Sequence, residues 1–369
     1  MVCATLCSRD VTPSTSDREP PSRAVNLQDI ADRAGVSLAT ASRVLGNGSR
    51  RVTDELIERV TRAAAELGYS ANLSARTVAT GHSSIVGVLV HDISDPYFST
   101  IAAAVAQRAD RDAAVVSIGN AFGDAARELA YVSMMRSMRA RALVVAGSRS
   151  DDADGNRALR DELEAFERGG GRAVCIGQPL LGIDTVAPEN EAGAEALAVA
   201  LVAAGHRDFA VLAGPPNLHT ARDRLRGFRA GLEKAGIALS ERDVITGEFN
   251  RDGGYEALAT LLSRSAGAPL QGCVFAVNDV MAVGALACLR TAGLDVPGDV
   301  AVAGFDDIVT LRDVWPRLTT VRLPLEAIGE MVGRLALDQE QDEAPRLLRI
   351  PGEVILREST ALPAGRVAS

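Results

Sequence analysis

Polar and aromatic side chains follow several apolar runs of the chain, at the point where each run ends. The last of these runs ends before Asp306 and Asp307, and the previous one ends before Asn278 and Asp279. Carboxylate, amide and guanidinium groups make paired hydrogen bonds to hydroxyl groups, and an aromatic ring covers a flat apolar face of a ligand. This set of side chains predicts a binding site for a sugar or a similar polyol. The candidates that follow the other runs are Asp92, Asp95, Tyr97, Phe98, Thr220, Arg222, Arg224, Phe249, Asn250 and Arg251.

Some of these residues also have an ordinary structural explanation. An aspartate after a strand often caps the next helix, so a cap and a ligand contact are equally good interpretations of Asp279. Asp307 also fits a cap or a salt-bridge partner, which makes Asp306 the better ligand candidate. An acid–base pair of Asp306 and Asp307 is disfavoured, because sequence neighbours on a loop usually point apart and no nucleophile accompanies them.

The apolar runs are typical of buried strands, and helical patterns such as 191–204, 221–235 and 279–291 lie between them. This alternation predicts an α/β body with parallel sheets covered by helices, and eight strands predict two doubly wound lobes. Ligands of such sheets bind at the carboxyl ends of the strands, so the candidate side chains are expected to share one cleft. The runs occupy residues 85–90, 114–119, 142–147, 173–177, 209–214, 244–249, 272–277 and 300–305.

Near the N-terminus, the stretch AGVSLATASRV predicts a tight corner between two short helices. Asn26 or Gln28 can start the first helix, and Gly35 suits the left-handed conformation in which helices often end. Ser37 can then accept a backbone N–H at the start of the second helix, 38–45.

A third helix begins after Thr53, which can cap it, and ends at Gly68. Three short helices in about 45 residues predict a helix-turn-helix DNA-binding domain. The alternative is an ordinary helical hairpin that contains AGVS by chance.

The second of these helices is expected to read base edges. Arg43 can make two hydrogen bonds to guanine O6 and N7 in the major groove, with a generic phosphate contact as the alternative. Leu38 and Ala39 offer apolar contact, for example to a thymine methyl group. The residues suited to phosphate contacts are Ser37, Thr40 and Ser42.

Residues 71–82 predict a hinge with a helix at 73–79, capped by Asn72. Such a short helix is unstable in water without a partner. Ala75 and Val78 form a small apolar face, so two copies packed across a dyad, with Val78 wedged into the minor groove, would order it. A plain flexible linker is the alternative.

Charge is unevenly divided along the chain. The net charge is −9, whereas residues 23–81 contain eight arginines and six acidic residues. A slightly basic segment on an acidic body suits a nucleic-acid contact confined to one end. The expected parts are a disordered tail (1–24), a helix-turn-helix domain (25–70), a hinge (71–82), a two-lobed body (83–361) and a second tail (362–369).

Other classes of function are disfavoured. The five cysteines form no C-x-x-C pair and the four histidines lack metal-binding spacing. No phosphate-binding loop or nucleophile elbow is present. No apolar run reaches the ~20 residues of a membrane span, and the first residues lack a signal-peptide pattern. We expect a cytoplasmic protein without cofactor, metal, membrane contact or enzymatic activity.

The head motif LQDIADRAGVSLATASRVL and the body motifs VFAVNDVMAVGAL, VAVAGFDDI and ILREST resemble the lactose/galactose-repressor family of bacterial transcription regulators. The resemblance covers residues 25–361. It implies a homodimer that reads a pseudo-palindromic operator in double-stranded DNA, with a body similar to periplasmic sugar-binding proteins. A small effector in the cleft of each body then controls operator affinity.

By this resemblance, Arg43 matches a base-reading arginine and Phe249 stacks on the effector. Val78 replaces the family's usual leucine. Leu218 lacks the charge that purine-binding members carry, which disfavours a purine effector. A repressor is the expected function. One alternative is a solute-binding protein with a vestigial head. The other is a sugar-processing enzyme, but no set of candidate catalytic residues supports it. The further positions that match effector contacts are Thr220, Arg224, Asn278 and Asp306.

Overall fold

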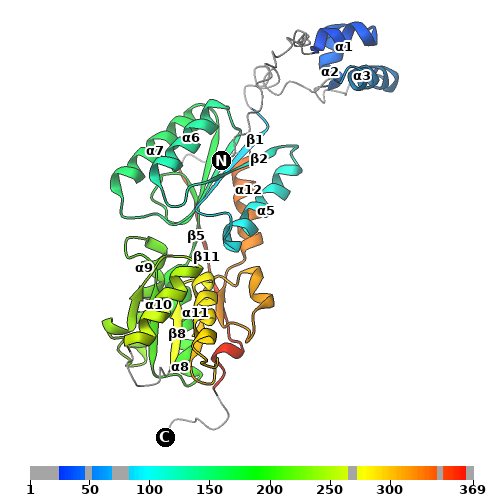
Figure 1. Cartoon of the computed structure of the whole chain (residues 1–369). Helices are drawn as coiled ribbons and strands as arrows, with labels where there is room; N and C mark the ends of the chain where they lie inside the picture. The colour runs from blue at the N-terminus through cyan, green and yellow to red at the C-terminus, as the bar shows by residue number, and fades with distance from the viewer. Residues whose placement is uncertain (1–24, 46–51, 69–82, 265–271, 339–343, 363–369) are drawn as a thin grey trace, which may run out of the picture. The chain divides into compact units, whose positions relative to one another are not determined.

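The computed structural model describes residues 25–45, 52–68, 83–264, 272–338 and 344–362. The chain forms two compact units, which divide between Arg76 and Thr77 and are called here the head and the body (Figure 1). The predicted hinge positions Asn72, Ala75 and Val78 lie outside the described residues. No described helix is long and apolar enough to cross a membrane.

The head contains the three predicted helices, α1 (Leu27–Ala34), α2 (Leu38–Leu45) and α3 (Asp54–Glu66). Asn26 starts α1, because its side chain accepts the N–H groups of Gln28 and Asp29 at 2.9 and 3.1 Å. The Asp29 carboxylate in turn accepts the N–H of Asn26 at 2.8 Å, which completes a capping box.

The corner between α1 and α2 has the predicted chemistry. Gly35 ends α1 in the left-handed conformation, with a φ of 62°. The Ser37 hydroxyl accepts the N–H of Thr40 at 3.1 Å, which confirms it as the cap of α2. Thr53 occupies the N-cap position of α3 as predicted, but its side chain makes no cap hydrogen bond. The first turn of α3 instead carries the carboxylates of Asp54 and Glu55, which favour the positive end of the helix.

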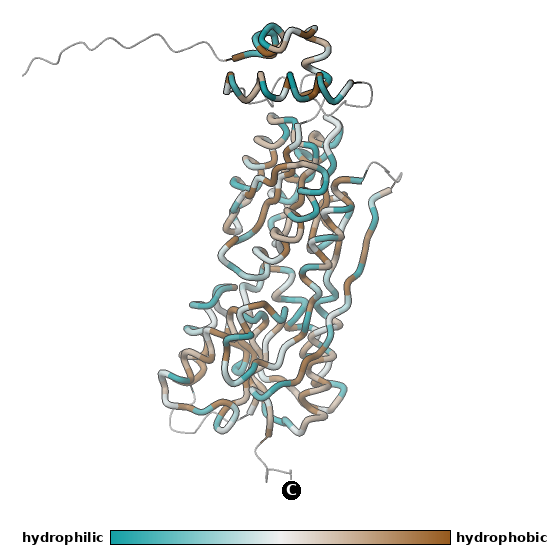
Figure 2. Tube along the Cα trace, turned by 90° about the vertical axis from the view of Figure 1, so that its right-hand side faces the viewer, coloured by the Kyte–Doolittle hydropathy of each residue, from teal (hydrophilic) through white to brown (hydrophobic). Residues whose placement is uncertain are grey.

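A small apolar core holds the head together. Figure 2 shows hydrophobic and hydrophilic residues alternating around its helices. Most core side chains are alanines, so the short helices approach each other closely and bury their inner faces. The buried residues are Ile30, Ala31, Ala34, Ala41, Val60, Ala63 and Ala64.

The N-terminal lobe of the body is built on a six-stranded parallel sheet in the order β11-β5-β4-β3-β1-β2. In Figure 1, α6 (Ala125–Ser137) and α7 (Ala153–Arg168) cover one face, and α5 (Pro96–Asp110) and α12 (Leu325–Leu337) cover the other. The strands are β1 (Ile85–Val90), β2 (Val115–Asn120), β3 (Ala142–Ala146), β4 (Arg172–Ile176), β5 (Asp184–Pro188) and β11 (Leu347–Ile350).

The C-terminal lobe has a four-stranded parallel sheet in the order β7-β6-β8-β9 and a small antiparallel pair, β10-β12. The helices that pack on these strands are α8 (Asn190–Ala203), α9 (His219–Lys234), α10 (Arg251–Arg264) and α11 (Asp279–Thr291). The strands are β6 (Phe209–Ala213), β7 (Val244–Thr246), β8 (Cys273–Ala276), β9 (Ala301–Ala303), β10 (Thr320–Arg322) and β12 (Glu353–Ile355).

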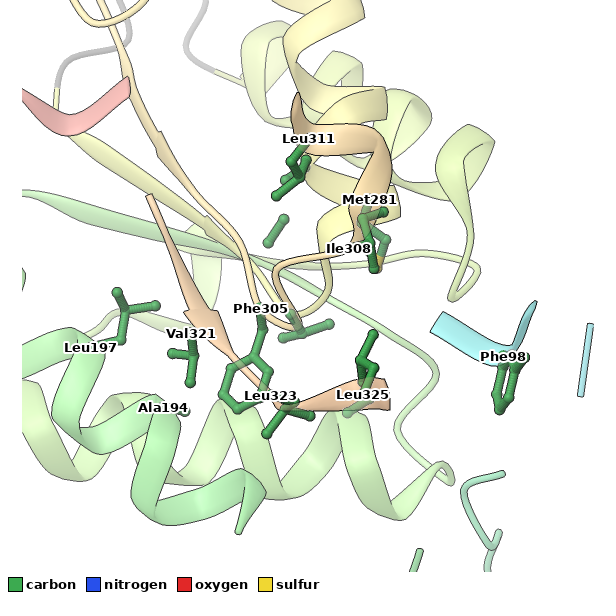
Figure 3. Close-up of a cluster of buried hydrophobic side chains, with 14 of the residues drawn as sticks. Phe98, Ala194, Leu197, Met281, Phe305, Ile308, Leu311, Val321, Leu323 and Leu325 are labelled. Carbon is green, nitrogen blue, oxygen red and sulfur yellow. The ribbon is translucent and has the colours of Figure 1, made fainter. Parts of the chain in front are cut away.

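All eight predicted strands are present, but β5, β10, β11 and β12 were not predicted. The strand order shows that the chain passes between the lobes three times, after β5, after β10 and after β11. Within the C-terminal lobe, the ring of Phe305 lies beside Ala194 and Val321 (Figure 3). A Cβ at neighbouring Gly193 would come 2.9 Å from that ring, so a glycine is required there.

Candidate functional site

One cavity of the body is lined by residues of both lobes. All seven effector-contact residues predicted from the sequence lie around it, although their contact with a ligand remains a prediction. These are Tyr97, Phe98, Thr220, Arg224, Phe249, Asn278 and Asp306. The other lining residues are Asp95, Gly147, Ser148, Ile176, Gly177, Pro188 and Asn190.

A buried ion pair forms one wall of this cavity. Both Arg224 Nη atoms reach the Asp306 carboxylate, at 2.7 and 3.2 Å, and both side chains are buried. Arg224 also donates to the Asn190 side chain and to the Val277 carbonyl, at 2.9 and 2.8 Å, and lies over the Phe305 ring. Burial raises the pKa of Asp306, and the adjacent guanidinium opposes that rise.

Asn278 and Phe249 approach the cavity from two loops of the C-terminal lobe. The Asn278 side chain caps α11 by accepting the N–H of Met281 at 2.8 Å, and its amide nitrogen lies 3.4 Å from the Phe249 carbonyl. Phe249 does not end a strand as predicted, because β7 stops at Thr246. Its ring instead covers Gly214, where a Cβ would come 2.6 Å from the ring.

Asp95, Tyr97 and Phe98 approach from the start of α5 in the N-terminal lobe. Asp95 caps this helix by accepting the N–H of Tyr97 at 2.9 Å. Burial raises the pKa of the Asp95 carboxyl to about 7, and the charge of Asp306 adds to the rise. Burial also raises the pKa of Tyr97, so its phenol stays protonated. The two aromatic rings meet edge to face with centroids 5.0 Å apart.

Direct bonds join the two lobes beside this cavity. The Thr220 N–H donates to the Ser148 hydroxyl at 2.9 Å, and the Gln178 amide donates to the Thr220 hydroxyl at 3.1 Å. Asp151 forms an ion pair of 3.0 Å with Arg222, and its carboxylate also lies 3.0 Å from His219 Nε2; both partners belong to α9. The cavity measures about 40 Å³, far below the ~300 Å³ of a small ligand site, so the lobes must separate to admit a sugar.

Several sequence candidates do not line the cavity. Arg222 forms the ion pair with Asp151 that joins the two lobes. Asp279 is fully buried and accepts the Thr320 hydroxyl and the Ile308 N–H at 2.7 and 3.0 Å, so it is neither the cap of α11 nor a cavity residue. Asp307 forms salt bridges with Arg322 and Arg357, which confirms the second of the two interpretations given for it, a cap or a salt-bridge partner.

The remaining candidates have local structural roles. Asp92 accepts the N–H of Ser94 at 2.9 Å, and Asn250 accepts that of Gly253 at 2.8 Å. Arg251 pairs with its exposed neighbour Asp252.

Sequence reasoning missed cavity residues that carry little chemistry of their own. Gly147 and Gly177 follow β3 and β4 and have positive φ values of 156° and 143°. The glycine at the end of each of these two apolar runs was therefore an available signal for a close approach of backbone to a ligand. Asn190 gave no such signal, because its role depends on Arg224, which lies 34 residues away in the sequence.

The head presents the predicted DNA-contacting face. Ser37, Leu38, Ala39, Ser42 and Arg43 are exposed, whereas Thr40 is half-buried. The Thr40 hydroxyl lies 2.9 Å from that of Ser37. Ala41 is fully buried against α1 and α3, so the exposed residues share the opposite side of α2. Arg43 has no hydrogen-bond or ion-pair partner among the described residues, which leaves its guanidinium available.

Family comparisons match both units. The model of the lacI family of bacterial regulatory proteins matches residues 26–72, and that of the periplasmic binding protein-like domain matches residues 198–360. The transcriptional regulator GalR of Escherichia coli K12 is 34% identical over 313 residues, which cover 84% of this chain and 88% of GalR.

Two solved structures are similar over nearly their whole lengths. The lac repressor dimer bound to operator and the anti-inducer ONPF has a TM-score of 0.74 at 27% identity, with 92% of this chain and 100% of that chain covered. The complex of the transcriptional regulator CelR with cellobiose has a TM-score of 0.64 at 28% identity, covering 91% and 99%. With the three-helix head and the two-lobed body, these matches show that the chain belongs to the lacI family of bacterial regulatory proteins.

Proposed function

We propose that the protein is a repressor that binds a pseudo-palindromic operator as a homodimer. The exposed side of α2 supplies the DNA contacts, with Arg43 reading a guanine and Ser37 and Ser42 holding phosphates. The lac repressor, a structural relative, is a dimer bound to operator. As a DNA-binding regulator the protein acts in the cytoplasm.

We further infer that a sugar or sugar derivative binds in the cavity between the lobes and changes operator affinity. The single observation that carries this inference is the arrangement of seven predicted side chains, from both lobes, around one cavity. Phe249 supplies a flat apolar face, and Asp95 and Asn278 supply polar groups for hydroxyls. CelR, a structural relative, is seen with cellobiose.

The cleft offers a physical basis for such control. A ligand shifts an equilibrium only by its difference in affinity for the two states. A sugar that contacts α5 on one lobe and Phe249 on the other binds tightly only at one separation of the lobes. The operator and the sugar must therefore change each other's affinity by the same factor.

A gel-shift experiment with the full chain tests the proposal. The DNA is the upstream region of its own gene and of neighbouring genes, with and without sugars that raise the melting temperature in a thermal-shift screen. We expect a shifted band that weakens steeply with salt, because phosphate contacts release counterions. A folded dimer that binds a sugar but gives no shift at low salt would instead support a solute-binding protein.

A further inference from the structure

A second cavity of about 440 Å³ lies elsewhere on the body. It shares no lining residue with the cavity described above. Four arginine side chains line it, together with one end of α12 and the short helix η3 (Val309–Asp313). The arginines are Arg312, Arg317, Arg322 and Arg357.

These arginines outnumber the acidic residues that face them. Asp307 and Glu326 are the only carboxylates among the lining residues, whose charges sum to +2 in a chain of −9. Outside the lining, Glu353 pairs with Arg322 at 3.7 Å. Asp307 is already paired with Arg322 and Arg357, at 2.7 Å each. Arg312 and Arg317 are exposed and have no side-chain partner among the described residues. Two guanidinium groups thus remain for an incoming anion.

The first turn of α12 adds backbone donors to the same cavity. The helix begins at Leu325, and its cap residue Pro324 provides no side-chain hydrogen bond. Leu325 and Glu326 both line the cavity. The Leu325 N–H already donates to the Leu323 carbonyl at 2.9 Å, so the Glu326 N–H is the donor that this turn adds beside the cavity. The helix dipole also favours negative charge at this end.

One side of the cavity is apolar. The buried side chains Ile308, Leu311, Leu323 and Leu325, which are labelled in Figure 3, line it. A guanidinium cluster binds phosphate oxygens in pairs, whereas an apolar wall accommodates carbon atoms. We propose that this cavity binds the phosphate group of a small molecule, either a phosphorylated metabolite or free phosphate.

A phosphate at this position contacts both lobes. Thr100 of α5 and the start of α12 belong to the N-terminal lobe, whereas η3 and Arg357 belong to the C-terminal lobe. The helix η3 already packs against α5. The bound anion therefore stabilises one arrangement of the lobes and is coupled to ligand binding in the other cavity.

Isothermal titration of the full chain tests the site with three probes, namely inorganic phosphate, glucose 6-phosphate and glucose. The variant Arg312→Gln/Arg317→Gln removes the two unpaired charges without touching the buried core. Its matched control is Arg168→Gln/Arg242→Gln, whose side chains are 70% and 85% exposed. We expect a phosphate-bearing probe to bind the wild type and the control, and to lose about tenfold or more in affinity for the test variant.

The probes also separate the two sources of the phosphate group. Equal affinities for inorganic phosphate and glucose 6-phosphate indicate free phosphate, and tighter binding of glucose 6-phosphate indicates a phosphorylated metabolite. If neither inorganic phosphate nor glucose 6-phosphate binds the wild type, the proposal is overturned. The proposal is also overturned if binding survives in Arg312→Gln/Arg317→Gln but disappears in Phe249→Ala. In that case the ligand occupies the cavity between the lobes that Phe249 lines.

Discussion

Arg224 and Asp306 face each other across 2.7 Å in a buried ion pair, on the wall of the cavity between the lobes. Sequence reasoning selected both as separate ligand contacts, yet each is the main partner of the other. Arg224 has three further acceptors or rings around it, so its position is fully determined without a ligand. The pair therefore presents a rigid polar wall against which a sugar hydroxyl can bind.

Removal of one partner of this pair should be costly. Asp306→Ala leaves the guanidinium of Arg224 buried without its counter-charge, and we expect a loss of about 3–5 kcal/mol in the free energy of unfolding. Urea denaturation measures it. The double variant Arg224→Met/Asp306→Leu should lose less than Asp306→Ala, because no charge is left buried. Arg242→Ala, at an exposed pair, should change stability by less than about 0.5 kcal/mol. Equal losses for all three variants would contradict this account.

The raised pKa of Asp95 makes stability depend on pH. Its pKa rises from 3.8 in the unfolded chain to about 7 in the folded protein. As the pH rises from about 4 to about 7, the unfolded chain has lost this proton while the folded protein still holds it, so the contribution of Asp95 to stability falls. Melting temperatures across this range should therefore fall less steeply for Asp95→Asn than for the wild type. An identical slope in the two proteins would show that Asp95 titrates normally.

The glycine at the head's corner is required by its backbone conformation. Gly35→Ala should destabilise the head by about 1–2 kcal/mol, because an L-residue is strained in the left-handed region. An added Cβ would also lie 3.1 Å from Arg59. Gly68→Ala is the matched control, with a φ of 61° and no atom of the described residues within 4 Å of the new Cβ. Circular dichroism of both variants separates strain from crowding, and a larger loss for Gly68→Ala would contradict the crowding at Gly35.

Arg43 should contribute sequence specificity. Arg43→Ala is expected to weaken specific operator binding by about 1–3 kcal/mol and to relax the preference at one base pair. Fluorescence anisotropy with operator variants measures both effects. Arg168→Ala, an exposed change in the body, should leave DNA binding unaltered. If the loss is the same for every DNA sequence, Arg43 contacts only phosphate.

Local chemistry explains which features the sequence predicted. The corner at Gly35 and Ser37 depends on residues within one helical turn, and the eight long apolar runs contain their own strand signal. The strand β5 was missed because it begins with Asp184 and ends with Pro188. The short strands β10 and β12 each include a charged residue, Arg322 or Glu353, and so give no apolar run. Likewise, no local pattern shows that Arg224 pairs with Asp306, since 82 residues separate them.

The return of β11 and α12 to the first lobe has a consequence for biosynthesis. Strand β5 pairs with β11, and α12 covers the sheet beside β3 and β4. Ribosomes add ~5–20 residues per second, so on the order of ten seconds pass between the emergence of Pro188 and that of Ile350. During this interval the nascent lobe has five strands with an open edge, and the part of one face that α12 later covers is exposed. Chaperone binding to nascent chains that end before Leu325 should accordingly exceed binding to chains that extend past Ile350.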